Sequence, residues 1–320
     1  MDSILLIAIL LAFYVAWSIG SNDITMGPLA GSGFLNILMI TAIGGISTFL
    51  GAMLLGQNVE HTLGNELLSG SITSVETLII VFSIATWITI SSWRGWAIST
   101  THSAIGSAVG LGLVKWGLSG VAWRRIYGVV GAWIASPFIG LGFSYILWKI
   151  FSAFLQRYVR GFLNYVKLSR YSAYLLLLFC SFMSFVRGAN DIGNATAFIS
   201  VKVAYNPLLV RGLAGIGMLL GLMILGRTVL KSVGLEIIKI TPLKGLSVEI
   251  CTSMILFVAT LWGIPLSSTH ILIGSIVGVG LAEDTWVNFS KLITLMLTWI
   301  GTFLGAATIC IIVYLVVDLI

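Results

Sequence analysis

Charged residues divide the chain into long apolar stretches. Nine stretches contain no Asp, Glu, Lys or Arg: 3–22, 24–59, 77–93, 95–114, 126–148, 171–186, 212–226, 250–282 and 292–317. A helix crosses the roughly 30 Å hydrocarbon core of a bilayer with about 20 residues. The lengths of these stretches therefore predict helices that span a membrane, and nothing in the chain has the alternating ten-residue pattern of a transmembrane barrel.

Two of the stretches are too long for one crossing. The stretch 24–59 is interrupted by Gly27-Pro28 and by Gly31-Ser32-Gly33, which predicts a short half-helix followed by a full span. The stretch 250–282 is interrupted at Gly263-Ile264-Pro265. We therefore expect an all-α, polytopic membrane protein with roughly ten to twelve membrane segments, some of them broken helices or re-entrant hairpins.

Composition supports the membrane assignment. Apolar residues make up 58% of the 320 residues, only 9% are charged, and the mean hydropathy is +1.07. Because a soluble domain carries about one quarter charged residues, a soluble or disordered protein is excluded. A nucleic-acid-binding module is excluded with it, despite a pI near 9.3. The isolated cysteines, Cys180, Cys251 and Cys310, indicate reduced packing residues.

The chain contains an internal duplication. The segment Ser21–Ile24 (Ser-Asn-Asp-Ile) recurs 168 residues later as Ala189–Ile192 (Ala-Asn-Asp-Ile). The segment Ser99–His102 (Ser-Thr-Thr-His) recurs at the same offset as Ser267–His270 (Ser-Ser-Thr-His). Two unrelated motifs at one offset predict two repeats. We place the first repeat at 1–150, a basic linker at 151–170 and the second repeat at 171–320.

The distribution of Lys and Arg predicts that the two repeats are inverted. The linker 151–170 has four basic and no acidic residues, which predicts a cytoplasmic position. The loop 57–77 has three Glu and no Lys or Arg, whereas the equivalent loop 227–249 has four Lys or Arg. Equivalent loops with opposite Lys and Arg content should lie on opposite sides of the membrane. This arrangement places the N-terminus outside the cell. The loop with Lys115, Arg124 and Arg125 then falls outside, against the rule.

Carboxylates at membrane depth are the first candidate site. Asn22-Asp23 and Asn190-Asp191 follow apolar stretches and adjoin glycines. An ionised carboxylate in hydrocarbon costs about 3 kcal/mol on insertion scales, so it persists where it faces protein, water or a cation. Oxygen-rich sites suit a hard cation. The alternative is that these side chains only cap helices; their repetition in both halves favours a functional site.

Hydroxyl side chains at two predicted helix starts are the second candidate site. Consecutive hydroxyls there leave free N–H groups and the positive end of the helix dipole, which bind anions. The alternative is capping together with hydrogen bonds between helices. Each adjacent histidine, His102 and His270, anchors its loop or contacts substrate. The hydroxyl residues are Ser99, Thr100, Thr101, Ser267, Ser268 and Thr269.

Two arginines stay outside the predicted site. Arg187 precedes Gly188-Ala189-Asn190-Asp191 and either pairs with Asp191, attracts an anion, or snorkels from the end of a span. Arg94 lies between Trp93 and Trp96, which indicates a membrane interface or a hairpin tip.

These motifs resemble those of the PiT family of inorganic phosphate transporters, whose signature is a Gly-Ala-Asn-Asp-type motif and a Pro-Val-Ser-Thr-Thr-His-type motif in each half. The second half has Gly188–Ala195 (Gly-Ala-Asn-Asp-Ile-Gly-Asn-Ala) and Pro265–His270 (Pro-Leu-Ser-Ser-Thr-His). The first half has Gly20–Gly27 and Ala97–His102, with Met26 where the second Asn is expected and Ala97 in place of Pro. The resemblance covers nearly the whole chain.

The resemblance implies a cation-coupled phosphate carrier with two inverted repeats, in the form of a homodimer in the cell membrane. It implies that the Asn-Asp motifs supply sodium or proton coupling, with sodium favoured and bound by the two aspartates, and that the hydroxyl motifs hold phosphate. No cofactor and no nucleic-acid partner are expected. The coupling residues so implied are Asn22, Asp23, Asn190, Asp191 and Asn194.

Our hypothesis is secondary active uptake of phosphate by alternating access. One alternative is a permease of the same fold for sulfate or another oxyanion, and another is an ion channel lined by the two repeats. An intramembrane enzyme is not expected, because the histidines form no His-Glu-x-x-His array and no nucleophile triad stands apart from the repeats.

Overall fold

The computed structural model describes residues 3–60, 68, 70–202, 206–234, 240–285 and 287–319. Over these residues the regular structure is helical, with one isolated antiparallel bridge between Leu68 and Val121. The all-α expectation is therefore confirmed. Helices satisfy their own backbone hydrogen bonds, which a chain in hydrocarbon requires.

In the described part of the chain, seven helical segments are long and apolar enough to cross a membrane. These are α3 (Ile37–Leu55), α5 (Ser74–Trp93), α7 (Trp123–Tyr158), α8 (Phe162–Lys202), α9 (Pro207–Gly221) with its continuation, α11 (Pro242–Leu261) and α13 (Phe289–Asp318). The remaining helices are α1 (Ser3–Ser21), α2 (Gly27–Ser32), α6 (Thr100–Trp116), α10 (Arg227–Gly234) and α12 (Ser268–Ala282), with a 3₁₀ turn at Gly117–Gly120 and a π-helical turn at Leu222–Gly226.

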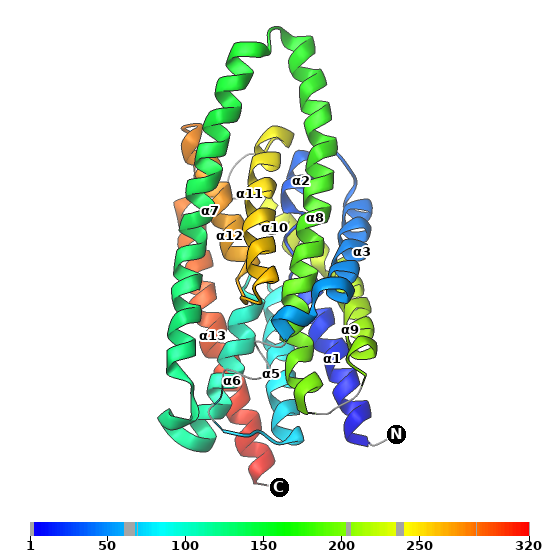
Figure 1. The fold of residues 1–320 in the computed structure, drawn as a ribbon, viewed down its shortest axis with the longest axis vertical. Coiled ribbons are helices and arrows are strands. Elements are labelled where there is room, and N and C mark those ends of the chain that lie inside the picture. Colours follow the sequence, from blue (N-terminus) through cyan, green and yellow to red (C-terminus); the bar gives the residue numbers. More distant parts are fainter. Residues whose placement is uncertain are drawn as a thin grey trace.

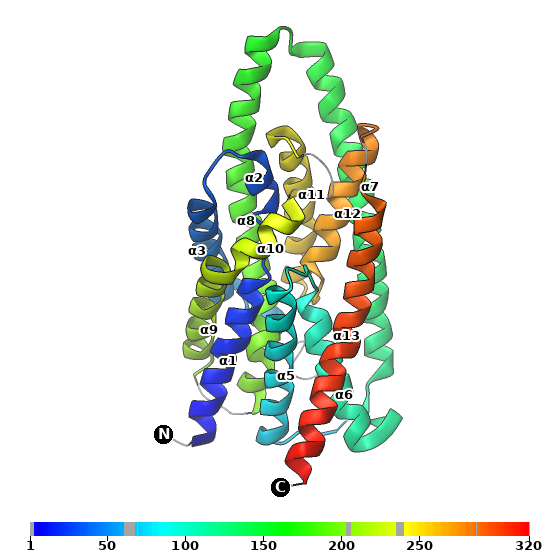
Figure 2. The same cartoon turned by 180° about the vertical axis from the view of Figure 1, so that it is seen from behind.

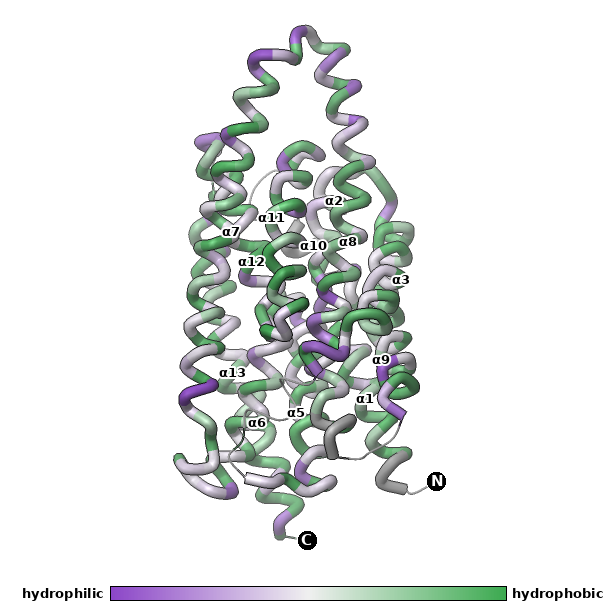
Figure 3. Tube along the Cα trace, in the orientation of Figure 1, coloured by the Kyte–Doolittle hydropathy of each residue, from purple (hydrophilic) through white to green (hydrophobic). Residues whose placement is uncertain are grey.

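The helices form an elongated bundle with a hairpin at one end (Figure 1). The helices α7 and α8 extend beyond the other helices, and both chain ends lie at the opposite end of the molecule. The basic linker 151–170 is therefore helical over most of its length, because α7 continues to Tyr158 and α8 begins at Phe162. Figure 3 shows hydrophilic residues at the tip of this hairpin, above a largely hydrophobic bundle.

The predicted breaks in the first half are present. The half-helix α2 ends at Ser32 and is capped by Gly33, whose φ of 68° favours a residue without a β-carbon, and the full span α3 follows. Between α5 and α6, and again between α11 and α12, the chain turns partway along the length of the bundle before the next helix begins at Thr100 or Ser268.

Two sequence expectations about the second half are wrong. The Asn190-Asp191 pair does not follow the end of a helix, because α8 continues through it to Lys202. The loop 227–249 is shorter than expected, because α11 begins at Pro242 and places Glu249 inside a span.

The equivalent helices α5 and α11 begin at opposite ends of the bundle (Figure 2). The first turn of α5 lies near the chain ends, where Glu76 pairs with Lys115. The first turn of α11 lies on the side of the α7–α8 hairpin, where Lys244 pairs with Glu283. Both helices run inward from these ends, so their connections to α6 and α12 meet in the interior.

Candidate functional site

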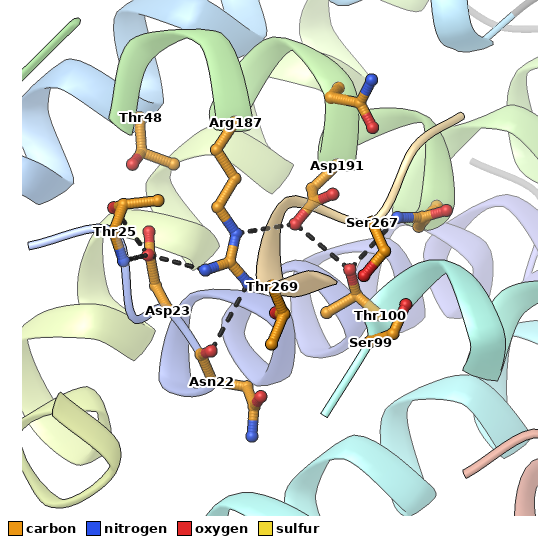
Figure 4. Close-up of polar contacts among 12 residues, drawn as sticks. Asn22, Asp23, Thr25, Thr48, Ser99, Thr100, Arg187, Asp191, Ser267 and Thr269 are labelled. Atoms are coloured by element: carbon orange, nitrogen blue, oxygen red, sulfur yellow. Dashed lines mark hydrogen bonds and ion pairs between the residues drawn. The ribbon is translucent and has the colours of Figure 1, made fainter. Parts of the chain in front are cut away.

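Arg187 joins the two Asn-Asp motifs in the centre of the bundle (Figure 4). Its Nη1 donates to Asp23 Oδ1 at 2.7 Å, and its Nε donates to Asp191 Oδ2 at 2.9 Å. A third donor, Nη2, reaches the backbone carbonyl of Asn22 at 3.4 Å. The three charged side chains are 1–2% exposed. One guanidinium therefore holds together carboxylates from both halves of the chain.

Local structure explains this geometry. Arg187 and Asp191 lie four residues apart on α8 and therefore on one face of the helix. Asp23 lies in the link between α1 and α2, where its Oδ1 accepts from Thr25 N at 2.8 Å and Thr25 Oγ1 at 2.7 Å. The Thr25 hydroxyl also contacts Ser184 Oγ on α8 at 2.7 Å. The link is therefore tied to the helix that carries Arg187.

The charges of this cluster are unequal. A buried arginine can satisfy two carboxylates because its planar guanidinium presents donors in a fixed fork. When both carboxylates are ionised, they carry one negative charge more than the single guanidinium neutralises. The snorkelling interpretation of Arg187 is wrong, because its side chain is buried. Its i,i+4 spacing from Asp191 is the signal in the sequence that could have identified the pair.

The two hydroxyl motifs contact each other and the acidic cluster, which consists of Asp23, Asp191 and Arg187. Thr100 Oγ1 donates to Asp191 Oδ2 at 3.1 Å, so the first half reaches the second. Thr269 Oγ1 donates to the backbone carbonyl of Ile98 at 3.2 Å, so the second half reaches the first. Asn194 Nδ2 lies 3.5 Å from Thr100 Oγ1. The motifs that the sequence placed in separate halves thus surround one region.

The serines that open these motifs cap their helices. Ser99 accepts from the backbone N–H of His102, and Ser267 accepts from that of His270. The capping alternative therefore holds for these two hydroxyls. Thr101 Oγ1 is buried and has no hydrogen-bond partner among the described residues. Ser268 and Thr269, in the first turn of α12, are also buried.

The two histidines anchor each half of the chain to the other. His102 Nδ1 lies 3.1 Å from the Trp299 carbonyl, and His270 Nδ1 lies 3.2 Å from the Trp133 carbonyl. The two imidazole rings contact each other edge to face, with centroids 4.8 Å apart. These contacts agree with the interpretation that each histidine anchors its segment by a hydrogen bond.

The two asparagines that precede the aspartates hold the chain where it turns inside the bundle. Asn22 Nδ2 donates to the Trp96 carbonyl at 2.8 Å, and Asn22 Oδ1 accepts from Ile98 N at 2.9 Å. Asn190 Nδ2 donates to the equivalent carbonyl, that of Ile264, at 3.2 Å. These bonds fix the segments that lead into the first turns of α6 and α12.

Several buried oxygens of the cluster remain without a partner. Among the described residues, Asn190 Oδ1, Asp191 Oδ1 and Asn194 Oδ1 accept no hydrogen bond. Buried polar atoms are normally satisfied, so unsatisfied oxygens indicate where a ligand binds. The described residues contain no group of three His, Cys, Asp or Glu side chains that could hold a metal ion. A cation here would therefore rely on amide, hydroxyl and single carboxylate oxygens, which suit hard ions.

Comparison with known proteins agrees with this arrangement. The model of the phosphate transporter family matches residues 19–310. A candidate phosphate permease of Pyrococcus furiosus is 27% identical, with 98% of this chain and 96% of the relative covered. The chloroplastic inorganic phosphate transporter 2-1 of Arabidopsis thaliana is 24% identical over 95% of this chain and 70% of the relative. A solved structure described as the sodium-dependent phosphate transporter superposes with a TM-score of 0.89 at 25% identity, with both chains fully covered.

Proposed function

The chain belongs to the phosphate transporter family, and from this membership we propose that it imports inorganic phosphate together with a sodium ion by alternating access. The observation that carries the proposal is the convergence of both Asn-Asp motifs and both hydroxyl motifs around Arg187. Sodium as the coupling ion is supported by the solved relative, which is a sodium-dependent phosphate transporter. Transport, and no enzymatic reaction, is the activity of the family.

The cation binds beside Asp191. The unpartnered oxygens of Asp191, Asn194 and Asn190 supply ligands, and the Thr100 hydroxyl lies beside them. Asp23 adds a second negative charge near this cation site, because it is bonded to the same Arg187 guanidinium as Asp191. Because the acidic cluster carries one negative charge in excess, one monovalent cation neutralises it.

Phosphate binds at the first turns of α6 and α12. Free backbone N–H groups and the helix dipoles favour an anion there, and Thr101, Ser268 and Thr269 contribute buried hydroxyls. A bare divalent anion in a medium of low dielectric constant is strongly unfavourable. Arg187 and the bound cation offset that charge, so occupancy of the two sites is coupled.

The two halves form inverted repeats that move against each other. Support comes from α5 and α11, which begin at opposite ends of the bundle, and from the equivalent contacts of Asn22 and Asn190. The protein acts in the cell membrane as a homodimer, as the resemblance of its motifs implies.

Uptake into proteoliposomes tests the proposal. Radiolabelled phosphate should accumulate when a sodium gradient is imposed, and Asp191→Asn should abolish this accumulation. Asp318→Asn is the matched control, because Asp318 is exposed at the end of α13. Full uptake by Asp191→Asn would refute the assignment of the site. Uptake of sulfate in place of phosphate, or unitary currents that need no co-ion, would refute the proposed activity.

A further inference from the structure

Another buried carboxylate, that of Glu249, lies in the bundle outside the site described above. Glu249 is in α11, in the interior of a helix long and apolar enough to span the bilayer, and its side chain is 0% exposed. Both carboxylate oxygens lack a hydrogen-bond partner in the part of the chain that the structure describes. No other buried carboxylate in that part leaves both oxygens unpartnered.

If Glu249 is ionised, no positively charged side chain among the described residues is seen to pair with it. Burial of a charge is tolerated when the group is paired, hydrogen-bonded or neutralised. The basic residue of the first turn of α11, Lys244, forms an ion pair with Glu283. Arg187 is engaged by Asp23 and Asp191. Among the described residues, Glu249 therefore has no cationic partner, and its charge calls for a cationic ligand.

Glu249 is close enough to the acidic cluster for the charges to interact. Its carboxylate interacts electrostatically with Asp23 and with the Cys180 thiol of α8. Cys180 Sγ also accepts a hydrogen bond from the backbone N–H of Leu29 in the half-helix α2. The sequence of α2, Gly-Pro-Leu-Ala-Gly-Ser, contains no titratable side chain. A positive charge taken up at Glu249 therefore weakens the repulsion at Asp23.

The surroundings of Glu249 suit a proton better than a metal ion. Cys180 belongs to an apolar cluster that includes Met26, Leu29 and Leu246. The hydroxyls that follow Glu249 on its helix, Thr252 and Ser253, donate to backbone carbonyls of α11. A sodium ion needs several oxygen ligands around it, whereas a proton needs one carboxylate oxygen.

We infer that Glu249 is a proton-binding site within the membrane, which takes up a proton from one side and releases it to the other during the transport cycle. This inference rests on the proposed function, since it adds a proton to the sodium ion and phosphate already assigned. The proton binds one carboxylate oxygen and leaves from the same atom.

Proton binding is tested first without transport. Infrared difference spectra of the purified protein, recorded between acidic and alkaline pH, should contain the carbonyl band of a protonated carboxylic acid. Glu249→Gln should remove that band, and Glu283→Gln, the same substitution at a partly exposed residue, should not. A difference spectrum unchanged by Glu249→Gln would overturn the inference, whatever the protein transports.

Coupling is tested second, in proteoliposomes. A pH gradient, acidic outside, should accelerate sodium-driven phosphate uptake by the wild-type protein and by Glu283→Gln. Glu249→Gln should lose this acceleration and retain phosphate exchange across the membrane at equal pH. Acceleration that persists in Glu249→Gln would overturn the inference and leave the proposed function intact. Absence of sodium-driven uptake in the wild type would refute the proposed function, while the infrared result would still decide on Glu249.

Discussion

Arg187 Nη1 donates to Asp23 Oδ1 at 2.7 Å, and the contact connects residues 164 positions apart in the sequence. The arginine belongs to the second half of the chain and the aspartate to the first. The contact therefore holds the link between α1 and α2 against α8, next to the residues assigned to cation binding. The fold around the proposed site should therefore depend on the positive charge of Arg187.

Replacing the bridging arginine should destabilise the protein. Arg187→Gln leaves two buried carboxylates without their cation, and the loss of one partner of a buried ion pair costs about 3–5 kcal/mol. We expect a lower unfolding temperature of the purified protein in detergent and loss of phosphate uptake. The double variant Arg187→Gln/Asp191→Asn should recover part of the stability, because it removes one of the uncompensated charges.

Arg94→Gln serves as the comparison for that experiment. Arg94 lies at the end of α5 beside the exposed Trp93 and Trp96, outside the bundle interior. Its substitution should change the unfolding temperature little. Equal stability of Arg187→Gln and Arg94→Gln would contradict the structural role of the bridge.

Removal of one unpartnered oxygen should weaken cation binding. Asn194→Ala deletes an amide whose Oδ1 accepts no hydrogen bond among the described residues. We expect the sodium concentration for half-maximal uptake to rise about tenfold, which corresponds to about 1.4 kcal/mol of binding free energy. The measurement is initial phosphate uptake as a function of sodium concentration. Asn164→Ala, at an exposed position of α8, should leave the curve unchanged, and an unshifted curve for Asn194→Ala would remove that residue from the site.

Close contact between α3 and α8 should not tolerate a methyl group. A β-carbon on Gly51 would lie 1.7 Å from the backbone oxygen of Phe185, so Gly51→Ala must push the two helices apart. We expect a loss of about 1–3 kcal/mol in stability, measured by thermal unfolding. Gly142→Ala on α7 meets nothing within 4 Å and should be neutral or slightly stabilising. Similar behaviour of the two variants would show that the helices are not in close contact.

The two histidines should be energetically coupled. Their rings are 4.8 Å apart, and each bonds a carbonyl of the helix that contacts the other ring. Stability measurements on His102→Leu, His270→Leu and the double variant should give a coupling free energy of about 0.5–1.5 kcal/mol. A cycle between His102→Leu and the distant Tyr174→Leu should be additive. Additivity in the histidine cycle as well would mean that the two rings do not interact.

Much of the fold could be predicted because hydrocarbon imposes simple demands. The spans follow from runs without charge, since a charged side chain is costly in lipid. The half-helix before α3 follows from Gly and Pro positions, since these residues interrupt helices. The continuation of α8 through Asn190-Asp191 could not be predicted in this way. Polar residues inside a helix cannot be distinguished in sequence from polar residues that follow a helix. Inside α8, the Asp191 carboxylate is stabilised by its hydrogen bonds with Arg187 and Thr100.

The candidate site was predicted in part. Both Asn-Asp motifs and both hydroxyl motifs were singled out because they recur at one offset, and the structure brings them together. Their coupling and phosphate-binding roles stay predictions. The sequence does not place Arg187 in the site, because a lone arginine beside a span is equally consistent with an interfacial residue. The sequence places Glu249 in the loop 227–249, because the charged residues there suggest a loop more strongly than Thr241-Pro242 suggests the start of α11.

By itself, the sequence determined a helical membrane protein with oxygen-bearing motifs that recur at one offset. These properties depend on composition, spacing and the polarity of individual residues, all of which are local. Only the tertiary structure decided which charges meet. Pairing of Arg187 with Asp23, and isolation of Glu249 from any cation of the described chain, depend on how α1, α2, α8 and α11 pack. Packing brings together residues that are far apart in the chain, and Coulomb interactions depend on their distance and on water, not on their separation in sequence.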